Sequence, residues 1–189
     1  VYGVRGVFEH CKYDEKAVEN FFATCDCGTL PYIWQFTIDG EIIVIGRELS
    51  DFPRLVAKIN KKTAGARWVC FVHNLHFEYT FIRENFAFDK IFFTESRKPL
   101  YMDYGACQFR CTYRLTNLSL EKWGEQNGVA KKVGDLDYTI LRTPKTEMNE
   151  TEMNYCIYDL LVMVQGLKQY KKQYVHVWDI PLTLTGQIR

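Results

Sequence analysis

The sequence predicts an α/β domain in which helices flank a mixed β-sheet. Short apolar runs of strand length alternate along the chain with longer stretches in which apolar residues recur at helical spacing. Asp39 and Gly40 form the strongest hairpin turn signal in the chain and separate two runs of strand character. The length of 189 residues matches one domain, or one domain with a small appendage.

The expected strands begin with a short apolar run at residues 21–25, which stops at Asp26 and is typical of a buried strand. Residues 32–38 alternate between apolar and polar side chains, and residues 41–46 supply the return strand of the hairpin. The apolar run at residues 68–72 predicts another buried strand. Further strands are expected at residues 90–94 and within residues 100–114.

Four helices are expected, at residues 51–60, from 75 to about 85, at 118–126 and from 151 to about 173. Ser50 is the expected N-cap of the first helix. In the second helix, Phe77, Phe81 and Ile82 are expected to share one apolar face. Residues 134–138 are expected to form a loop.

The bulk composition predicts a folded protein without indicating its partner. A hydrophobic content of 47% is enough for a packed core. The 24 basic and 23 acidic residues give a net charge of +1, so charge alone does not mark a nucleic-acid-binding protein. The sequence shows no signal peptide and no apolar run near ~18 residues, so we expect a cytoplasmic protein that does not enter a membrane.

The seven cysteines do not suggest a zinc site or a disulfide framework. Their number is odd, Cys25 and Cys27 are too close to form an easy zinc pair, and no Cys-x-x-Cys pair is present to complete one. We therefore expect reduced, mostly buried thiols of the kind found in cytosolic proteins.

Three acidic residues lie at the ends of, or inside, apolar elements: Asp26, Glu78 and Asp159. Burying a lone carboxylate is costly, so such groups usually pair with a cation or bind a metal ion. If the three converge, their mutual repulsion requires a cation, and oxygen ligands favour Mg²⁺ or Mn²⁺ over zinc. Taken singly, Asp26 is also typical of a turn or a cap, and Asp159 could face solvent in the neighbourhood of Lys168 and Lys171.

Four segments, taken together, resemble a known family. Residues 71–82 read Phe-Val-His-Asn-Leu-His-Phe-Glu-Tyr-Thr-Phe-Ile, close to the pattern His-Asn-Leu-Lys-Phe-Asp-x-x-Phe-Ile. Residues 134–138 read Gly-Asp-Leu-Asp-Tyr, and residues 155–159 match Tyr-x-x-x-Asp. The fourth segment is the tail at residues 180–189, which reads Ile-Pro-Leu-Thr-Leu-Thr-Gly-Gln-Ile-Arg. These segments and their order resemble the 3′–5′ exonuclease domain of phage protein-primed family B DNA polymerases.

The resemblance implies a ribonuclease-H-like (DnaQ-like) exonuclease fold and a two-metal hydrolysis of a DNA 3′ end. It implies catalytic roles for Asp26, Glu78, Tyr155 and Asp159. The three acidic residues would bind Mg²⁺ or Mn²⁺, and Tyr155 would orient the attacking water.

The resemblance also implies a DNA-binding set. Asn74 and Phe77 would hold the single-stranded 3′ end, with the Phe77 ring stacked on a base. His73 and Thr112 would assist contact with DNA or with a terminal protein, and Tyr138 would support the geometry of the site. From the sequence alone, Phe77 is equally typical of a core residue and Asn74 of a helix N-cap.

The chain departs from the family at several of these positions. The first motif, normally Asp-x-Glu-Thr, reads Asp-Cys-Gly-Thr at residues 26–29, and Gly28 cannot bind a metal ion. Glu78 replaces an aspartate, Val133 replaces a catalytic lysine, and Tyr113 replaces a leucine. Because catalytic groups tolerate only about 0.5 Å of misplacement, impaired catalysis is expected.

The resemblance divides the chain into an N-terminal extension at residues 1–20, an exonuclease domain at 21–175 and the start of a connection to a polymerase domain at 176–189. Its expected setting is a phage protein in the host cytoplasm. Two alternatives stay open: a catalytically degenerate module that binds single-stranded DNA or a protein partner, and a ribonuclease-H-like nuclease that acts on RNA or junctions.

Overall fold

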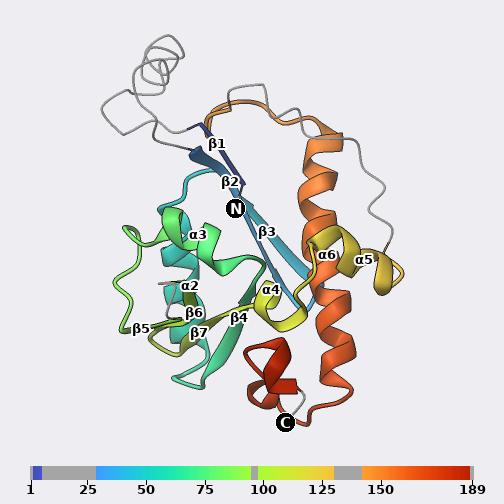
Figure 1. Cartoon of the computed structure of the whole chain (residues 1–189). Coiled ribbons are helices and arrows are strands. Elements are labelled where there is room, and N and C mark those ends of the chain that lie inside the picture. Colours follow the sequence, from blue (N-terminus) through green and yellow to red (C-terminus); the bar gives the residue numbers. More distant parts are fainter. Residues whose placement is uncertain (1, 6–28, 95–97, 130–141, 188–189) are drawn as a thin grey trace.

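The computed structural model describes residues 2–5, 29–94, 98–129 and 142–187 (Figure 1). Its strands are β1 (Tyr2–Arg5), β2 (Thr29–Ile38), β3 (Ile42–Gly46), β4 (Trp68–Val72), β5 (Lys90–Phe93), β6 (Pro99–Tyr104) and β7 (Cys107–Cys111). Its α-helices are α2 (Asp51–Lys62), α3 (Leu75–Ile82), α4 (Thr112–Thr116), α5 (Leu120–Gln126) and α6 (Glu150–Lys171). Two 3₁₀ turns, η2 (Val177–Asp179) and η3 (Leu184–Gln187), follow.

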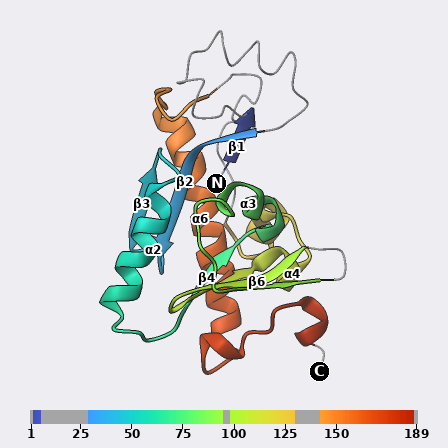
Figure 2. The same ribbon diagram turned by 90° about the vertical axis from the view of Figure 1, so that its left-hand side faces the viewer.

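The strands form two sheets. In the first, β2 lies between β1 and β3, and both pairings are antiparallel. In the second, the order is β4-β7-β6-β5; β4 and β7 are parallel, and the other two pairings are antiparallel. Figures 1 and 2 show α2 and α6 as separate helices beside these strands, with α6 the longest element of the molecule. The expectation of a mixed sheet flanked by helices is therefore confirmed.

An aromatic cluster joins α2 to both sheets. The Phe52 ring of α2 lies 5.3 Å from Trp34 of β2, 5.5 Å from Phe86 and 6.3 Å from Phe109 of β7, measured between ring centroids. Phe109 is the fully buried member of this cluster. The pairs of Phe52 with Phe86 and with Phe109 are edge-to-face, and each such pair adds about 0.5–1.5 kcal/mol beyond the burial of apolar area.

The N-terminal end of α6 is anchored by charge and capping. Asn149 and Glu152 form a reciprocal capping box, and the Glu152 carboxylate also pairs with the buried Arg142. Arg47, just after β3, donates to the backbone oxygens of Tyr32, Thr143 and Thr146. The hairpin of β2 and β3 is thus fixed to the segment that leads into α6.

Most of the predicted elements are confirmed within a few residues, including the hairpin turn, where Asp39 and Gly40 both adopt positive φ angles. Ser50 occupies the N-cap position of α2 as predicted, but its backbone is helical and its side chain makes no cap hydrogen bond. Two other features differ from what the sequence predicted. The run 100–114 ends as a strand at Cys111 and continues as helix α4. Tyr2–Arg5 forms a strand that the weakly patterned N-terminal sequence did not predict.

Two further expectations can be compared with the structure. Cys70, Cys107, Cys111 and Cys156 are free and buried, as predicted, whereas Cys11, Cys25 and Cys27 lie outside the described residues. Within the described ranges, no helix combines the length and apolarity that a membrane crossing requires.

The C-terminal half of α6 packs closely against α5. A Cβ atom at Gly166 would lie 2.3 Å from the indole ring of Trp123, a side chain that is only 3% exposed. The ring therefore occupies the space that any larger residue at position 166 would need.

We expect Gly166→Ala to lower the free energy of unfolding by about 1–3 kcal/mol, because the methyl group overpacks the contact with Trp123. The sign of this change tests the contact, because replacing glycine with alanine at an open helix position would instead raise the free energy of unfolding by about 1 kcal/mol. Urea denaturation followed by circular dichroism measures the change. In a Trp123→Leu background the smaller side chain leaves room for the methyl group, and Gly166→Ala should then cost little; an equal cost in both backgrounds would contradict the contact.

Candidate functional site

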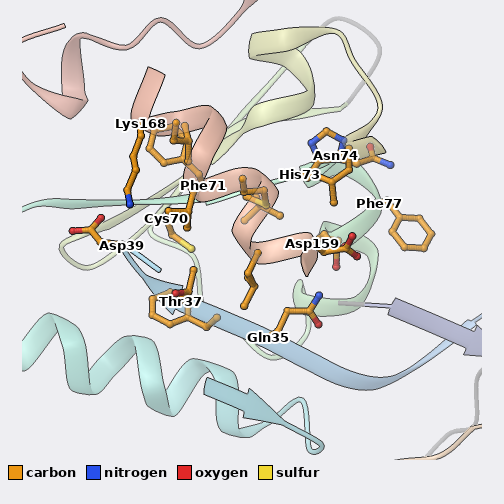
Figure 3. A pocket seen from close by; sticks show the side chains of 18 of the residues that line it. Gln35, Thr37, Asp39, Cys70, Phe71, His73, Asn74, Phe77, Asp159 and Lys168 are labelled. Atoms are coloured by element: carbon orange, nitrogen blue, oxygen red, sulfur yellow. The ribbon is translucent and has the colours of Figure 1, made fainter. Parts of the chain in front are cut away.

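A cavity of about 890 Å³ lies among β2, β4, α3 and α6 (Figure 3). Its lining includes six of the residues that the sequence analysis selected: His73, Asn74, Phe77, Glu78, Tyr155 and Asp159. These residues come from two segments that are more than seventy positions apart in the sequence. The fold brings both segments to the same cavity.

The turn between β4 and α3 presents Asn74 to the cavity. Asn74 adopts the left-handed conformation, with φ 57° and ψ 52°, which asparagine tolerates better than most residues. Its carbonyl oxygen accepts hydrogen bonds from the backbone of Phe77 and Glu78, but its side chain makes no cap hydrogen bond. The N-cap interpretation of the amide group is therefore wrong, and the exposed amide can contact a ligand.

Phe77 is not a core residue. Its side chain is 39% exposed and lines the cavity, while its ring meets Phe81 edge-to-face at 5.1 Å. Of the three residues expected on one apolar face of α3, Phe77 and Phe81 are in contact, and Ile82 lines the same cavity as Phe77 but is 2% exposed and belongs to the main core. An exposed ring held by a second ring offers a flat surface on which a base can stack.

Asp159 and Glu78 place carboxyl groups against the apolar part of the molecule. Asp159 is only 3% exposed, so it does not face solvent as one interpretation of α6 allowed. Glu78 is partly exposed as a residue, but its Oε2 atom is inaccessible. Burial raises the pKa of each carboxyl group to about 7, since the charged form loses its hydration.

Tyr155 lies one helical turn before Asp159 on α6 and is 8% exposed. Residues four positions apart share a face of a helix, so both side chains approach the cavity from the same side. The Tyr-x-x-x-Asp spacing in the sequence therefore corresponds to a real neighbourhood in the fold.

His73 is held as a neutral imidazole. Its Nδ1 atom lies 3.0 Å from Oγ1 of Thr112, whose hydroxyl group donates to the Val72 carbonyl oxygen. The imidazole also stacks on Trp123, and burial lowers the pKa of His73 to about 4. In this arrangement Nδ1 carries the proton and Nε2 is left as an acceptor.

Thr112 itself does not line the cavity. It is fully buried, so in this structure it contacts His73 and the backbone of β4. Its predicted contact with DNA or a terminal protein stays a prediction.

Two predicted residues, Asp26 and Tyr138, lie outside the described residues, as do Gly28 and Val133. Among the residues that the structure describes, no group of three or more His, Cys, Asp or Glu side chains could hold a metal ion. The acidic residues that line the cavity within the described ranges are Asp39, Glu41, Glu78, Glu121 and Asp159.

The sequence analysis missed the contribution of β2 and of the far end of α6. Gln35 and Thr37 line the cavity together with Phe36, so the alternation of polar and apolar residues along β2 did not reveal which of them do so. Lys168 and Lys171 line the opposite end, with Asp39 and Glu41 of the hairpin turn. Figure 3 shows Lys168 and Asp39 at one end of the view and Asp159 with Asn74 at the other.

Comparisons of the chain with models of protein families, with curated proteins and with solved structures found no match.

The two raised pKa values predict how stability depends on pH when a chelator is present. A carboxyl group whose pKa rises on folding stabilises the folded state fully below its unfolded pKa, and this stabilisation is lost as the pH rises through the folded pKa. For Asp159 and Glu78 the loss should fall between about pH 4 and pH 7 and amount to about 3 kcal/mol for Glu78 and about 4 kcal/mol for Asp159.

Urea titrations from pH 4 to pH 8 measure this dependence. Asp159→Asn and Glu78→Gln should each flatten the profile, because the amide does not titrate, whereas Glu125→Gln on the exposed face of α5 should leave it unchanged. A profile for Asp159→Asn that parallels the unaltered chain would show that the carboxyl group is hydrated in the folded state.

Proposed function

We propose that the chain is a ribonuclease-H-like 3′–5′ exonuclease domain of a phage-type protein-primed DNA polymerase, acting on a single-stranded DNA 3′ end. The observation that carries this proposal is the convergence of His73, Asn74, Phe77 and Glu78 with Tyr155 and Asp159 at one cavity. The mixed α/β architecture is compatible with the proposed fold. An attached polymerase domain, a terminal protein and the host cytoplasm complete the proposed setting.

The substrate side of the cavity favours a single strand over a duplex. The exposed Phe77 ring can stack on an unpaired base, and a stacked base contributes about 1–3 kcal/mol without reading its sequence. The amide of Asn74 offers both a donor and an acceptor beside that ring. A base inside a duplex would not present its face to Phe77, so a frayed or mismatched 3′ end is the proposed substrate.

The carboxylates of the cavity are the type of ligand that binds an oxygen-preferring divalent cation. Mg²⁺ is commonly held by one or two carboxylates together with water and substrate phosphates, and Glu78 with Asp159 supply two carboxylates. A bound Mg²⁺ or Mn²⁺ would polarise the phosphodiester and lower the pKa of a water molecule. Within the cavity, Tyr155 would orient that water, and the apolar lining would keep bulk solvent away from the carboxylates.

The substitutions in the motifs argue for weak catalysis. The side chain of Glu78 is one methylene longer than the expected aspartate, Gly28 offers no ligand, and Val133 offers no cation. A misplacement of about 1 Å is enough to reduce a rate about 100-fold. We therefore propose that hydrolysis is slow and more readily detected with Mn²⁺.

A second function is a binding module without catalysis. It is favoured by the departures from the family motifs at Gly28, Glu78 and Val133. In that case the cavity would hold a single strand of DNA, or a protein partner, through Asn74 and Phe77. The two functions share the binding residues and differ in their requirement for Asp159.

We expect the chain to shorten a 3′-labelled single-stranded oligonucleotide in the presence of Mn²⁺, and Asp159→Asn to reduce the rate at least about 100-fold through loss of a charged ligand. Tyr155→Phe should reduce the rate by about 10-fold or more while leaving binding intact. Denaturing gel electrophoresis of timed samples measures both changes. Glu125→Gln serves as a matched loss of charge outside the cavity.

Absence of shortening with Mn²⁺ and with Mg²⁺, at an enzyme concentration above that of the oligonucleotide, would reject catalysis and leave the binding module. Cleavage that persists in Asp159→Asn would point to a contaminating nuclease.

We also expect single-stranded DNA to bind in the presence of EDTA, and Phe77→Ala to weaken that binding by about 1–3 kcal/mol through loss of stacking. Phe77→Trp should preserve it. Fluorescence anisotropy of a labelled oligonucleotide gives the dissociation constants. Phe92→Ala removes an aromatic ring of similar exposure from β5, away from the cavity, and should change nothing. Equal losses for Phe77→Ala and Phe92→Ala would rule out a specific stacking role.

A further inference from the structure

Two arginine side chains contact one indole ring on the side of the second sheet that faces away from the main core. The guanidinium carbon of Arg67, just before β4, lies 4.5 Å from the ring centroid of Trp178 in η2, and that of Arg110 in β7 lies 4.8 Å from it. Phe109 belongs to the main core, so the next residue, Arg110, points to the opposite face of the sheet. Figure 2 shows the C-terminal turns on the side of β4 and β6 away from α3.

Arg110 is a buried cation whose direct partners are neutral. Its side chain is only 7% exposed, and its Nε atom donates to Oε1 of Gln108. Its Nη1 atom donates to three backbone oxygens of the C-terminal segment, those of Val177, Trp178 and Ile180. The carboxylate of Asp103 accepts from Gln108 and so reaches Arg110 only through that amide. Buried charges normally have a counter-ion in direct contact, and within the described part of the chain this guanidinium has none.

Arg67 adds a second positive charge beside the same ring. Its side chain is exposed and forms no ion pair with a residue that the structure describes. Burial, followed by the charge of Arg67, lowers the pKa of Arg110, while the charge of Asp103 acts in the opposite direction. An anion beside the two guanidinium groups would offset both the burial of one charge and the repulsion between the two.

Arg110 also keeps donors for such a ligand. Its Nη2 atom makes no hydrogen bond with any described residue and is not among the enclosed unpaired atoms, so its two N–H groups reach the surface. A guanidinium group presents N–H groups in a fork that matches the oxygens of a phosphate. Contact with Trp178 and with the C-terminal carbonyl groups already fixes Arg110, so its side chain loses little freedom when a ligand binds.

We propose that Arg67 and Arg110 form a binding site for a phosphate group, with Trp178 holding the two guanidinium groups in place. The ligand is a tetrahedral oxyanion with several acceptor oxygens, supplied as free phosphate or as the backbone of a single DNA strand. Neither arginine lines the cavity described above, although Val177 and Ile180, which accept from Arg110, do. This inference does not depend on the proposed nuclease activity.

Titration of the full chain with inorganic phosphate tests the site, with chloride added to keep the ionic strength constant. NMR follows the Nε–H signal of Arg110, identified by its loss in Arg110→Lys, and the indole N–H signal of Trp178. Millimolar phosphate should shift both signals with one dissociation constant. Arg67→Gln should raise that constant at least about tenfold, because one of the two charge-assisted contacts is lost.

Arg54→Gln is the matched control. Arg54 lies on α2, is exposed and pairs with Asp51, so the substitution makes the same change in net charge without touching Trp178. The dissociation constant for phosphate should stay within about twofold of that of the unaltered chain, since exposed charges at a distance are screened. Arg67 is itself exposed, so a folding defect is not expected to obscure the comparison.

An oligothymidylate without a terminal phosphate distinguishes the two sources of the ligand. If it displaces inorganic phosphate from Arg110, the site holds the phosphodiester backbone of a single strand; if phosphate alone shifts the two signals, the site takes free phosphate or a phosphomonoester. Absence of a shift with both probes would overturn the proposal and leave a contact that only fastens the C-terminal segment. Equal effects of Arg67→Gln and Arg54→Gln would overturn it as well.

Discussion

The burial of Asp159 in the middle of α6 is the constraint on which the site depends. A carboxyl group that is 3% exposed in a helix packed against apolar residues costs free energy unless a proton or a cation neutralises it. The helix that carries it is correspondingly well fixed. Its start is held by the capping box of Asn149 and Glu152, and its C-terminal half by the contact of Gly166 with Trp123. These contacts fix the position of α6 and therefore of the buried Asp159 carboxyl group.

Much of the architecture could be predicted because local patterns and tertiary packing agree. The hairpin around Asp39 and Gly40 and the helix α6 follow directly from turn chemistry and periodicity. The boundary at Cys111 could not be predicted, since β7 and α4 form one continuous stretch whose residues suit either state. The position of β1 could not be predicted either, because its pairing with β2 spans about thirty residues and leaves no local signature.

The candidate site could be predicted from the sequence only in part. Motif order selected Glu78, Tyr155 and Asp159, and the fold places them around one cavity. The orientation of Asn74 and Phe77 was not readable, because a helix start and an apolar residue in a helix each fit two environments equally well. Only tertiary contacts decide such cases: Leu75 and Ile82 are buried in the core, whereas Phe77 is exposed and lines the cavity. Thr112 shows the limit of motif reasoning, as its described contacts are with His73 and β4.

The distribution of charge along the cavity bears on how a nucleic acid would be held. His73 stays neutral at physiological pH, so the end of the cavity near Asn74 and Phe77 gains no positive charge from it. Lys168 lies nine residues after Asp159, about 14 Å along the helix axis, and so is remote from the carboxyl groups. Among the described residues that line the cavity, the Lys side chains are those of Lys168 and Lys171. In the proposed function, a phosphate at the Phe77 end would therefore be attracted by a bound cation, or its nucleotide would be held by stacking and amide contacts. A DNA end would be held there mainly by its bases, and a cation between Glu78 and Asp159 would be what draws its phosphate inward.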